Sequence, residues 1–221
     1  MLTLPNNVVD NCQPDELADN DVFNLLAGSG KTRCFPKNTV VLNEGDPSNY
    51  LCLINSGKLK VYLSDDSGHE IVLDFMGVGE YFGEMALIDN CGRSASVMTI
   101  EDSKLTFVTK DAFNACLAKN PQIASMLMLG LIRRLRHATK KIGSLALLDV
   151  YGRVANTLLH LAKEQDGQMV VDKLTHQEIA NLVGSSREMV TRIMHNLIEC
   201  GYITLGNNKQ IILNEKAKSP F

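Results

Sequence analysis

The sequence predicts an α+β chain, with a roll of antiparallel strands, then one long helix, then a helix-turn-helix followed by a hairpin. Three observations support this order. Between residues 35 and 108, short runs rich in β-branched and aromatic residues alternate with turn signals. From residue 124 to 145, apolar residues recur at alternating spacings of four and three. After residue 175, two short amphipathic helical patterns precede a strand-turn-strand pattern.

The composition is that of an ordinary globular protein. The chain has 221 residues, of which 45% are apolar and 21% charged, and this excludes disordered, collagen-like and fibrous proteins. No apolar run reaches the roughly 18 residues of a membrane span, and the acidic N-terminus lacks a signal-peptide pattern. The six cysteines form no C-x-x-C pair, so reduced thiols are expected. We therefore expect a cytoplasmic protein without a membrane partner.

The charge is distributed unevenly along the chain. Residues 1–110 hold 8 basic and 16 acidic side chains, whereas residues 111–221 hold 14 basic and 9 acidic ones. The C-terminal half is therefore the part that would approach a polyanion. Solvated basic helices are the alternative explanation.

Six strands are predicted in the N-terminal part, at residues 39–42, 50–54, 59–63, 71–75, 96–100 and 104–108. Turn signals about ten residues apart suit an antiparallel roll or barrel. Residues 27–32, Ala-Gly-Ser-Gly-Lys-Thr, look like a phosphate-binding loop of nucleotide triphosphatases. However, Leu25 stands where the first glycine belongs, so a helix that ends in glycine is expected.

A long helix is predicted from about Pro121 to Leu145. Its apolar stripe has coiled-coil spacing and consists of Ala124, Met128, Leu131, Leu135, Ala138, Ile142 and Leu145. Because a small roll cannot cover the whole stripe, we expect the helix to pair with its twin in a symmetric homodimer. Packing on the chain's own roll is the alternative. A second helical stretch is predicted at residues 147–164, before a surface turn at 165–167.

A helix-turn-helix is predicted at residues 175–201. Thr175 and Glu178 form a capping box, Gly184 ends the first helix, and Ser186 caps a second helix that ends at Gly201. Met189, Val190, Ile193 and Leu197 form the inward face of the second helix.

The outward face of this second helix is polar near its N-terminus, as in a helix that enters the DNA major groove. Arginine pairs with guanine, and glutamate accepts from the cytosine amine. Solvated helix charges are the alternative. The candidate DNA-contacting residues are Thr175, Gln177, Ser186, Arg187, Glu188, Thr191, Arg192 and, at the hairpin tip, Lys209.

One further segment lies where the predicted roll ends. Gly83-Glu84-Met85-Ala86-Leu87 and then Arg93-Ser94-Ala95 resemble the phosphate-binding cassette of the cyclic-nucleotide-binding β-roll. Together with the long helix, residues 145–153 and residues 184–188, they make the chain resemble the cAMP receptor protein/fumarate-nitrate regulator superfamily, from about residue 20 to 214. Within that superfamily, the resemblance is to the cAMP receptor protein branch.

The resemblance implies three regions. These are a cyclic-nucleotide-binding β-roll (a jelly roll) at residues 1–120, a dimerisation helix at 121–146 and a winged helix-turn-helix DNA-binding domain at 147–221. It also implies a homodimeric transcription regulator rather than an enzyme, with cAMP as allosteric ligand and with double-stranded DNA and RNA polymerase as partners. The DNA site implied is a TGTGA-like palindrome.

The resemblance also implies roles for single residues. Arg93 and Ser94 would hold the cyclic phosphate, Glu84 would accept from the ribose 2′-hydroxyl, and Gly83 would permit close backbone approach. The implied ligand-binding set is Gly83, Glu84, Met85, Ala86, Arg93, Ser94, Ala95 and Thr139.

The two adenine-contacting hydroxyl positions of the family are Ala138 and Thr139 here. Because alanine cannot form such a contact, the effector stays open between cAMP, another cyclic nucleotide such as cyclic di-GMP, and none. A thiol-based redox sensor and a nucleotide hydrolase at Lys31 are further alternatives. No metal site is expected, because the five histidines lack ligand spacing and only Cys12 lies near the N-terminus.

Overall fold

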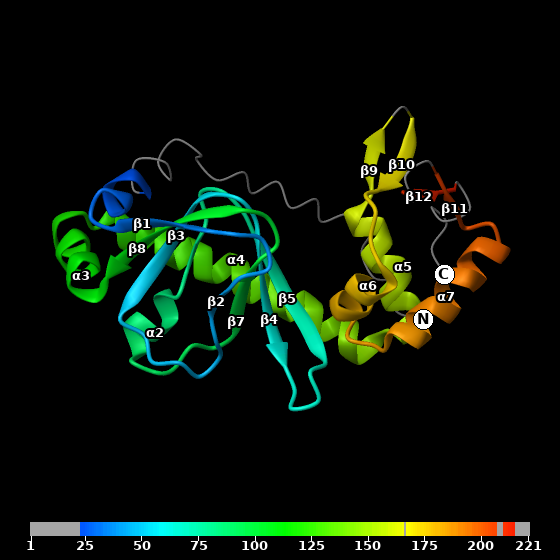
Figure 1. Cartoon of the computed structure of the whole chain (residues 1–221), viewed down its shortest axis with the longest axis horizontal. Helices are drawn as coiled ribbons and strands as arrows, with labels where there is room; N and C mark the ends of the chain where they lie inside the picture. The colour runs from blue at the N-terminus through cyan, green and yellow to red at the C-terminus, as the bar shows by residue number, and fades with distance from the viewer. Residues whose placement is uncertain (1–22, 166, 207–209, 215–221) are drawn as a thin grey trace, which may run out of the picture.

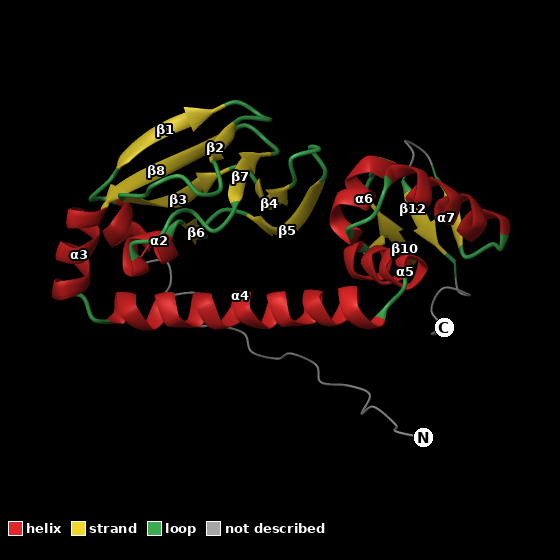
Figure 2. Cartoon of the chain, turned by 90° about the horizontal axis from the view of Figure 1, so that it is seen from below, coloured by secondary structure: helices red, strands yellow, loops and turns green. Residues whose placement is uncertain are grey.

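The structure is a computed structural model that describes residues 23–165, 167–206 and 210–214. A roll of antiparallel strands is followed by the long helix α4 (Gln122–Leu147) and by a C-terminal group of helices and short strands. Figure 2 shows the roll lying along one side of α4, with the C-terminal group beyond the end of that helix. The order of parts predicted from the sequence is confirmed.

The roll is formed by two four-stranded antiparallel sheets with strand orders β1-β8-β3-β6 and β2-β7-β4-β5 (Figure 1). Its strands are β1 (Lys31–Phe35), β2 (Val40–Leu42), β3 (Tyr50–Ser56), β4 (Leu59–Ser64), β5 (Glu70–Met76), β6 (Tyr81–Phe82), β7 (Ser96–Thr99) and β8 (Ser103–Thr109). The six predicted strands are present within two residues of their predicted ends. The prediction missed β1 and the two-residue β6.

Strand β3 explains how the roll is held together, because both of its faces are buried. Leu51 and Leu53 pack toward α3 (Lys110–Lys119) and α4. Cys52 and Ile54 point the other way, into the space between the two sheets. This alternation follows from the two-residue period of a strand, and it gives the roll two apolar clusters that share one strand.

Residues 23–27 form a helical turn that ends as predicted, with the Gly28 N–H donating to the Asn24 carbonyl. Lys31 then begins β1. A phosphate-binding loop of nucleotide triphosphatases would follow a strand and open a helix, so the order of elements here is the reverse.

Helix α4 has two apolar faces. Ile123, Met126 and Leu127 are buried against the roll, whereas Leu135 and Ile142, which belong to the predicted seam, are more than 60% exposed. Pro121 precedes the first helical residue, as predicted. Among the described residues, no single helix combines the length and apolarity needed to cross a membrane. Helices α3 and α4 reach that length and apolarity only when the two are taken together, and the chain bends sharply between them.

The C-terminal group is a helix-turn-helix with a four-stranded sheet of order β11-β12-β10-β9. It consists of α5 (Val150–Leu161), β9 (Lys163–Gln165), β10 (Gln168–Val171), α6 (His176–Val183), α7 (Arg187–Glu199), β11 (Ile203–Leu205) and β12 (Ile211–Leu213).

The predicted helix at 147–164 was too long at both ends. Leu148 is extended, and the Asp149 side chain accepts from the Gly152 N–H, which starts a new helix. At the other end, residues 163–165 pair with β10 as a strand. A local cap at one end and a hairpin with the next strand, β10, at the other therefore override the apolar periodicity.

Candidate functional site

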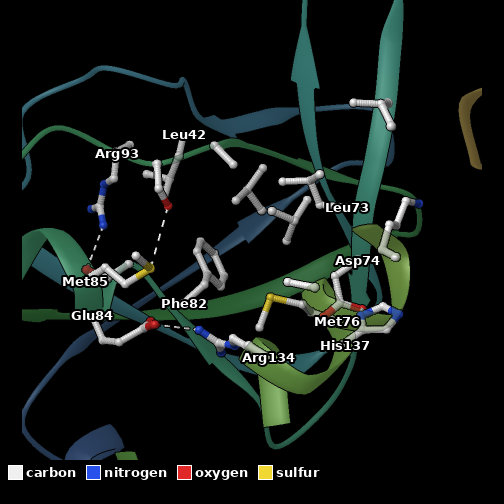
Figure 3. Close-up of a pocket in the computed structure, with 18 of the residues that line it drawn as sticks. Leu42, Leu73, Asp74, Met76, Phe82, Glu84, Met85, Arg93, Arg134 and His137 are labelled. Atoms are coloured by element: carbon white, nitrogen blue, oxygen red, sulfur yellow. Dashed lines mark hydrogen bonds and ion pairs between the residues drawn. The ribbon is translucent and has the colours of Figure 1, made fainter. Parts of the chain in front are cut away.

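A cavity of about 440 Å³ opens between the roll and α4, within the 300–1,000 Å³ range of small-molecule sites. Figure 3 shows charged side chains at its two ends and apolar side chains between them. Of the residues implied by the family resemblance, seven line this cavity: Gly83, Glu84, Met85, Ala86, Arg93, Ser94 and Ala95.

The cassette begins with Gly83, the residue before the short helix α2 (Glu84–Asp89). Gly83 has φ 86°, a left-handed conformation that favours glycine. A Cβ atom at Gly83 would lie 2.1 Å from Arg93 Nη1. No side chain caps α2, so the amide groups of its first turn are left for solvent or a ligand.

Arg93 is held in the wall of the cavity by backbone carbonyls. Its Nη1 donates to Gly83 O and its Nη2 to Tyr50 O, both at 2.9 Å, and the guanidinium lies 4.7 Å from the centre of the Tyr50 ring. The residue is only 4% exposed, and its Nε has no hydrogen-bond partner within the described part of the chain. A buried cation therefore retains a donor without an acceptor.

Glu84 is the counterpart of Arg93 on the other side of the cassette. It is 1% exposed, and its Oε1 accepts from Arg134 Nη1 at 2.6 Å. Arg134 also donates to the Tyr81 carbonyl. Glu84 Oε2 has no partner among the described residues. Because buried polar atoms are almost always hydrogen-bonded, this acceptor and the Arg93 donor indicate a ligand or water at this end.

The other members of the implied ligand set differ in position. Ser94 is exposed, and its hydroxyl lies 3.8 Å from Met85 Sδ. Thr139 is exposed, donates to the Leu135 carbonyl, and is not among the residues lining the cavity of this chain. Ala138 does line the cavity.

Sequence reasoning missed several residues that the fold brings to the cavity, namely Asp74, Arg134, His137 and Lys141. Three of them, Arg134, His137 and Lys141, lie on α4. Their spacing from 134 to 141 is that of one helical face, and this is the signal that could have identified them. Asp74 had no comparable signal, because its position depends on how β5 meets α4.

Lys141 also connects the roll to the helix-turn-helix. Its ammonium donates to Val72 O of β5 at 2.6 Å and to Leu182 O of α6 at 2.8 Å. Burial lowers the pKa of Lys141, and the nearby negative charge of Asp74 opposes that shift. A second contact across the same junction joins Asn181 Nδ2 to Glu70 Oε2 at 3.2 Å.

The predicted DNA-contacting face forms at the start of α7. Ser186 caps this helix through the Met189 N–H, and the Thr175–Glu178 capping box starts α6, both as predicted. Gly184, with φ 64°, makes the turn between the two helices. Val190, Ile193 and Leu197 are buried as predicted, together with Met194, while Met189 is only partly buried.

The charged residues Arg187, Glu188 and Arg192 are exposed. None of the three has a side-chain ion pair or side-chain hydrogen bond within the part of the chain that the structure describes. The Thr191 hydroxyl, in contrast, has partners within the protein. It lies 2.9 Å from His176 Nδ1 and donates to the Arg187 carbonyl. Gln177 is exposed and donates to Asn181, and Lys209 lies outside the described residues.

Comparison with known families gives two matches. Residues 32–120 match the cyclic nucleotide-binding domain, and residues 152–218 match the Crp-like helix-turn-helix domain. The first match contains the whole cassette and the second contains α6 and α7. Neither family is one of enzymes, and the relatives found are transcription regulators.

Whole-chain relatives agree with these matches. The CRP-like cAMP-activated global transcriptional regulator of Mycobacterium tuberculosis is 34% identical over 189 residues, which cover 83% of this chain and 84% of that protein. The cyclic AMP receptor protein of Thermus thermophilus is 36% identical over 174 residues, with 79% and 80% covered.

Among solved structures, the c-di-GMP responsive global regulator CLP of Xanthomonas campestris matches with a TM-score of 0.78 and 29% identity. The match covers 88% of this chain and 98% of that one. Together with the charged cassette in the roll and the exposed face of α7, these findings show that the chain belongs to the CRP family of cyclic nucleotide-responsive, DNA-binding transcription regulators.

Proposed function

We propose that this regulator binds cAMP in the cavity of the roll and, as a homodimer, then binds a palindromic DNA site. The observation that carries the proposal is the pair of buried, unpaired atoms in the cavity wall, Arg93 Nε and Glu84 Oε2. A 3′,5′-cyclic nucleotide supplies what each atom lacks, since its phosphate is an acceptor and its ribose 2′-hydroxyl a donor.

In the proposed complex, Arg93 and Ser94 bind the cyclic phosphate, and the uncapped first turn of α2 adds backbone donors. Glu84 accepts from the 2′-hydroxyl, while Arg134 holds its other oxygen in place. The remaining wall is largely apolar, with Val61, Leu73 and Met76 among its residues, and suits the faces of a purine.

The proposed dimer forms through the exposed apolar face of α4. Large apolar side chains rarely gather on the surface of a monomer without a partner. Those exposed on α4 include Met128, Leu129, Ile132 and Leu135, together with Ile142 and Leu145, which also line the cavity. Thr139 lies on the same helix, where its hydroxyl could serve the cavity of the partner subunit.

DNA binding is assigned to the start of α7. Arg187, Glu188 and Arg192 lie near a helix N-terminus, the part of a recognition helix that meets base edges, and their side chains have no partner among the described residues. With Arg contacting guanine and Glu contacting cytosine, the proposed half-site is TGTGA-like. RNA polymerase is the proposed protein partner and the cytoplasm the proposed location.

The test is the fluorescence anisotropy of a labelled TGTGA–TCACA palindrome titrated with the full chain at one fixed salt concentration, because salt alone changes such affinities. Parallel titrations contain no nucleotide, cAMP, cGMP or cyclic di-GMP. We expect tight binding with cAMP and weak binding without it. A control duplex with both half-sites scrambled should bind weakly in all four conditions.

Other outcomes would change specific parts of the proposal. Activation by cyclic di-GMP alone would replace the effector, a result that the solved structure of the c-di-GMP responsive CLP makes worth testing. Tight binding in every condition would mean a regulator active without ligand. No binding to the palindrome in any condition would overturn the half-site.

A further inference from the structure

The cavity has a second polar end, far from the cassette. Figure 3 shows Asp74 and His137 side by side at one end, Arg93 and Glu84 at the other, and Met76 and Phe82 between them. A ligand held by the cassette and long enough to cross the apolar middle would therefore meet a carboxylate.

Asp74 is built into this end by two contacts. Its Oδ1 accepts from the Phe75 N–H at 2.8 Å and lies 3.5 Å from His137 Nδ1. Its Oδ2 has no hydrogen-bond partner among the described residues. The side chain is 36% exposed, so this oxygen has room for a ligand. A carboxylate offers acceptors only.

Within the described residues of one chain, the neighbouring groups leave Asp74 as the main hydrogen-bond acceptor at this end. Ala138 lines the cavity beside His137 but has no hydrogen-bonding side chain. The ammonium of Lys141 already donates to Val72 O and Leu182 O. His137, in contact with Asp74, is best placed to orient the carboxylate.

We propose that Asp74 is the specificity-determining residue for the base, accepting a hydrogen bond from the exocyclic amine of a 6-aminopurine. This inference rests on the proposed function, since the cassette must hold the cyclic phosphate and ribose for the base to reach Asp74. His137 is a positioning residue in this arrangement.

The chemistry discriminates between bases. The 6-amino group of adenine donates to a carboxylate, whereas hypoxanthine and guanine present an oxygen at the same place. Two acceptors would then face each other without a proton between them, and such pairing is penalised. A purine with only hydrogen at this position would lose the contact without gaining repulsion.

The experiment measures dissociation constants by calorimetry for the full chain with three 3′,5′-cyclic nucleotides: cAMP, cIMP and purine riboside cyclic monophosphate. Compared with cAMP, the wild type should bind purine riboside cyclic monophosphate about tenfold to a hundredfold more weakly, the effect of one hydrogen bond to a charged group. It should bind cIMP more weakly still. This comparison needs no variant.

Asp74→Asn supplies the sharper test, because an amide can donate to the oxygen of hypoxanthine. The variant keeps an amide oxygen that can accept from adenine but loses the charge, so it should bind cAMP more weakly and hold or gain affinity for cIMP, which lowers the ratio of cAMP to cIMP affinity. Asp111→Asn, at an exposed aspartate in the first turn of α3, is the matched control and should behave like the wild type. His137→Ala should reduce the cAMP preference partly.

The outcomes separate the two proposals. If the wild type binds cAMP but Asp74→Asn keeps the same ratio of cAMP to cIMP affinity, the role of Asp74 is overturned while the cavity keeps its function. Equal binding of cAMP and purine riboside cyclic monophosphate by the wild type overturns it as well. If the wild type binds none of the three nucleotides, both proposals fail.

Discussion

The cavity and the start of α7 both carry charged side chains, but the fold treats the two sets in opposite ways. Glu84 and Arg93 are almost fully buried, and each is held by neighbours on all but one polar atom. Arg187 and Arg192 are exposed and engage no other side chain within the described residues. The chain therefore has one prearranged charged site and one that is open to solvent.

This difference has a physical cause. A buried charge must be compensated inside the protein, because desolvation is costly. An exposed charge pays no such cost and contributes little to stability. Substitutions in the cavity should therefore alter both ligand binding and folding, whereas those on α7 should alter DNA binding alone.

The largest expected contrast concerns two cysteines, one behind the cavity wall and one at the C-terminal end of α7. Cys52 is fully buried below the cavity wall, and burial raises its pKa from 9.0 to about 12 although the Arg93 charge opposes this. At pH 8 its thiolate fraction is then about a thousandfold below that of a thiol with the unshifted value. Cys200, at the end of α7, is exposed.

Mass spectrometry of iodoacetamide-treated native protein should thus find Cys200 modified and Cys52 unmodified. Labelling in denaturant, where both should react, is the control. Rapid native modification of Cys52 would contradict the burial and would favour the alternative of a thiol-based sensor.

The next effect is that of Arg93→Gln on nucleotide binding. Removing a buried charged partner typically costs about 2–5 kcal/mol, so cAMP affinity should fall by about thirtyfold or more. Calorimetry measures this loss, and thermal unfolding should show reduced stability, because the variant also disrupts the bonds to Gly83 O and Tyr50 O. Arg33→Gln, at an exposed arginine on β1, is the matched control. Unchanged cAMP affinity in Arg93→Gln would show that Arg93 does not bind the cyclic phosphate.

A smaller effect is expected from Arg192→Ala. It should weaken binding to the TGTGA palindrome by about 1–3 kcal/mol and relax base preference at one position. Anisotropy against a panel of single-base variants measures both. Thermal stability should not change, in contrast to Arg93→Gln. Equal weakening on every sequence would instead make Arg192 a phosphate contact, and Arg136→Ala on α4 is the control for loss of charge alone.

The smallest effect concerns the junction between the two sites. Lys141→Met removes two hydrogen bonds that join β5 to α6, which should cost about 1–2 kcal/mol of unfolding free energy. Because burial lowers the folded-state pKa of Lys141, the unfolded chain binds more protons between that pKa and 10.5. In that window, the free energy of unfolding of the wild type should therefore rise with pH relative to that of the variant.

Urea unfolding of both proteins from pH 8 to pH 10.5 measures this difference. Lys140→Met, at the adjacent exposed lysine, is the control for removal of a lysine from the surface of α4. Parallel curves for wild type and Lys141→Met would show that burial at the junction does not perturb the lysine.

Local sequence signals predicted much of the architecture, because each acts over a few residues. The glycine turns between β3, β4 and β5, the Thr175 capping box and the Ser186 cap are short-range features that need no tertiary partner. The start of α4 is also marked locally: it was predicted near Pro121, and the first helical residue is Gln122. What the prediction missed, such as strand β1, depended on a partner strand elsewhere in the chain, here β8.

The two functional sites also combine features set by short sequence motifs with contacts set by the tertiary fold. The sequence by itself determined the cassette, the helix-turn-helix and the family, because these depend on residue types at fixed short spacings. Only the tertiary structure decided that Arg93 is held by the Tyr50 carbonyl, that Glu84 pairs with Arg134, and that Asp74 meets His137. Each of these contacts joins residues 43 to 63 positions apart, and the packing of the roll on α4 sets which of them meet.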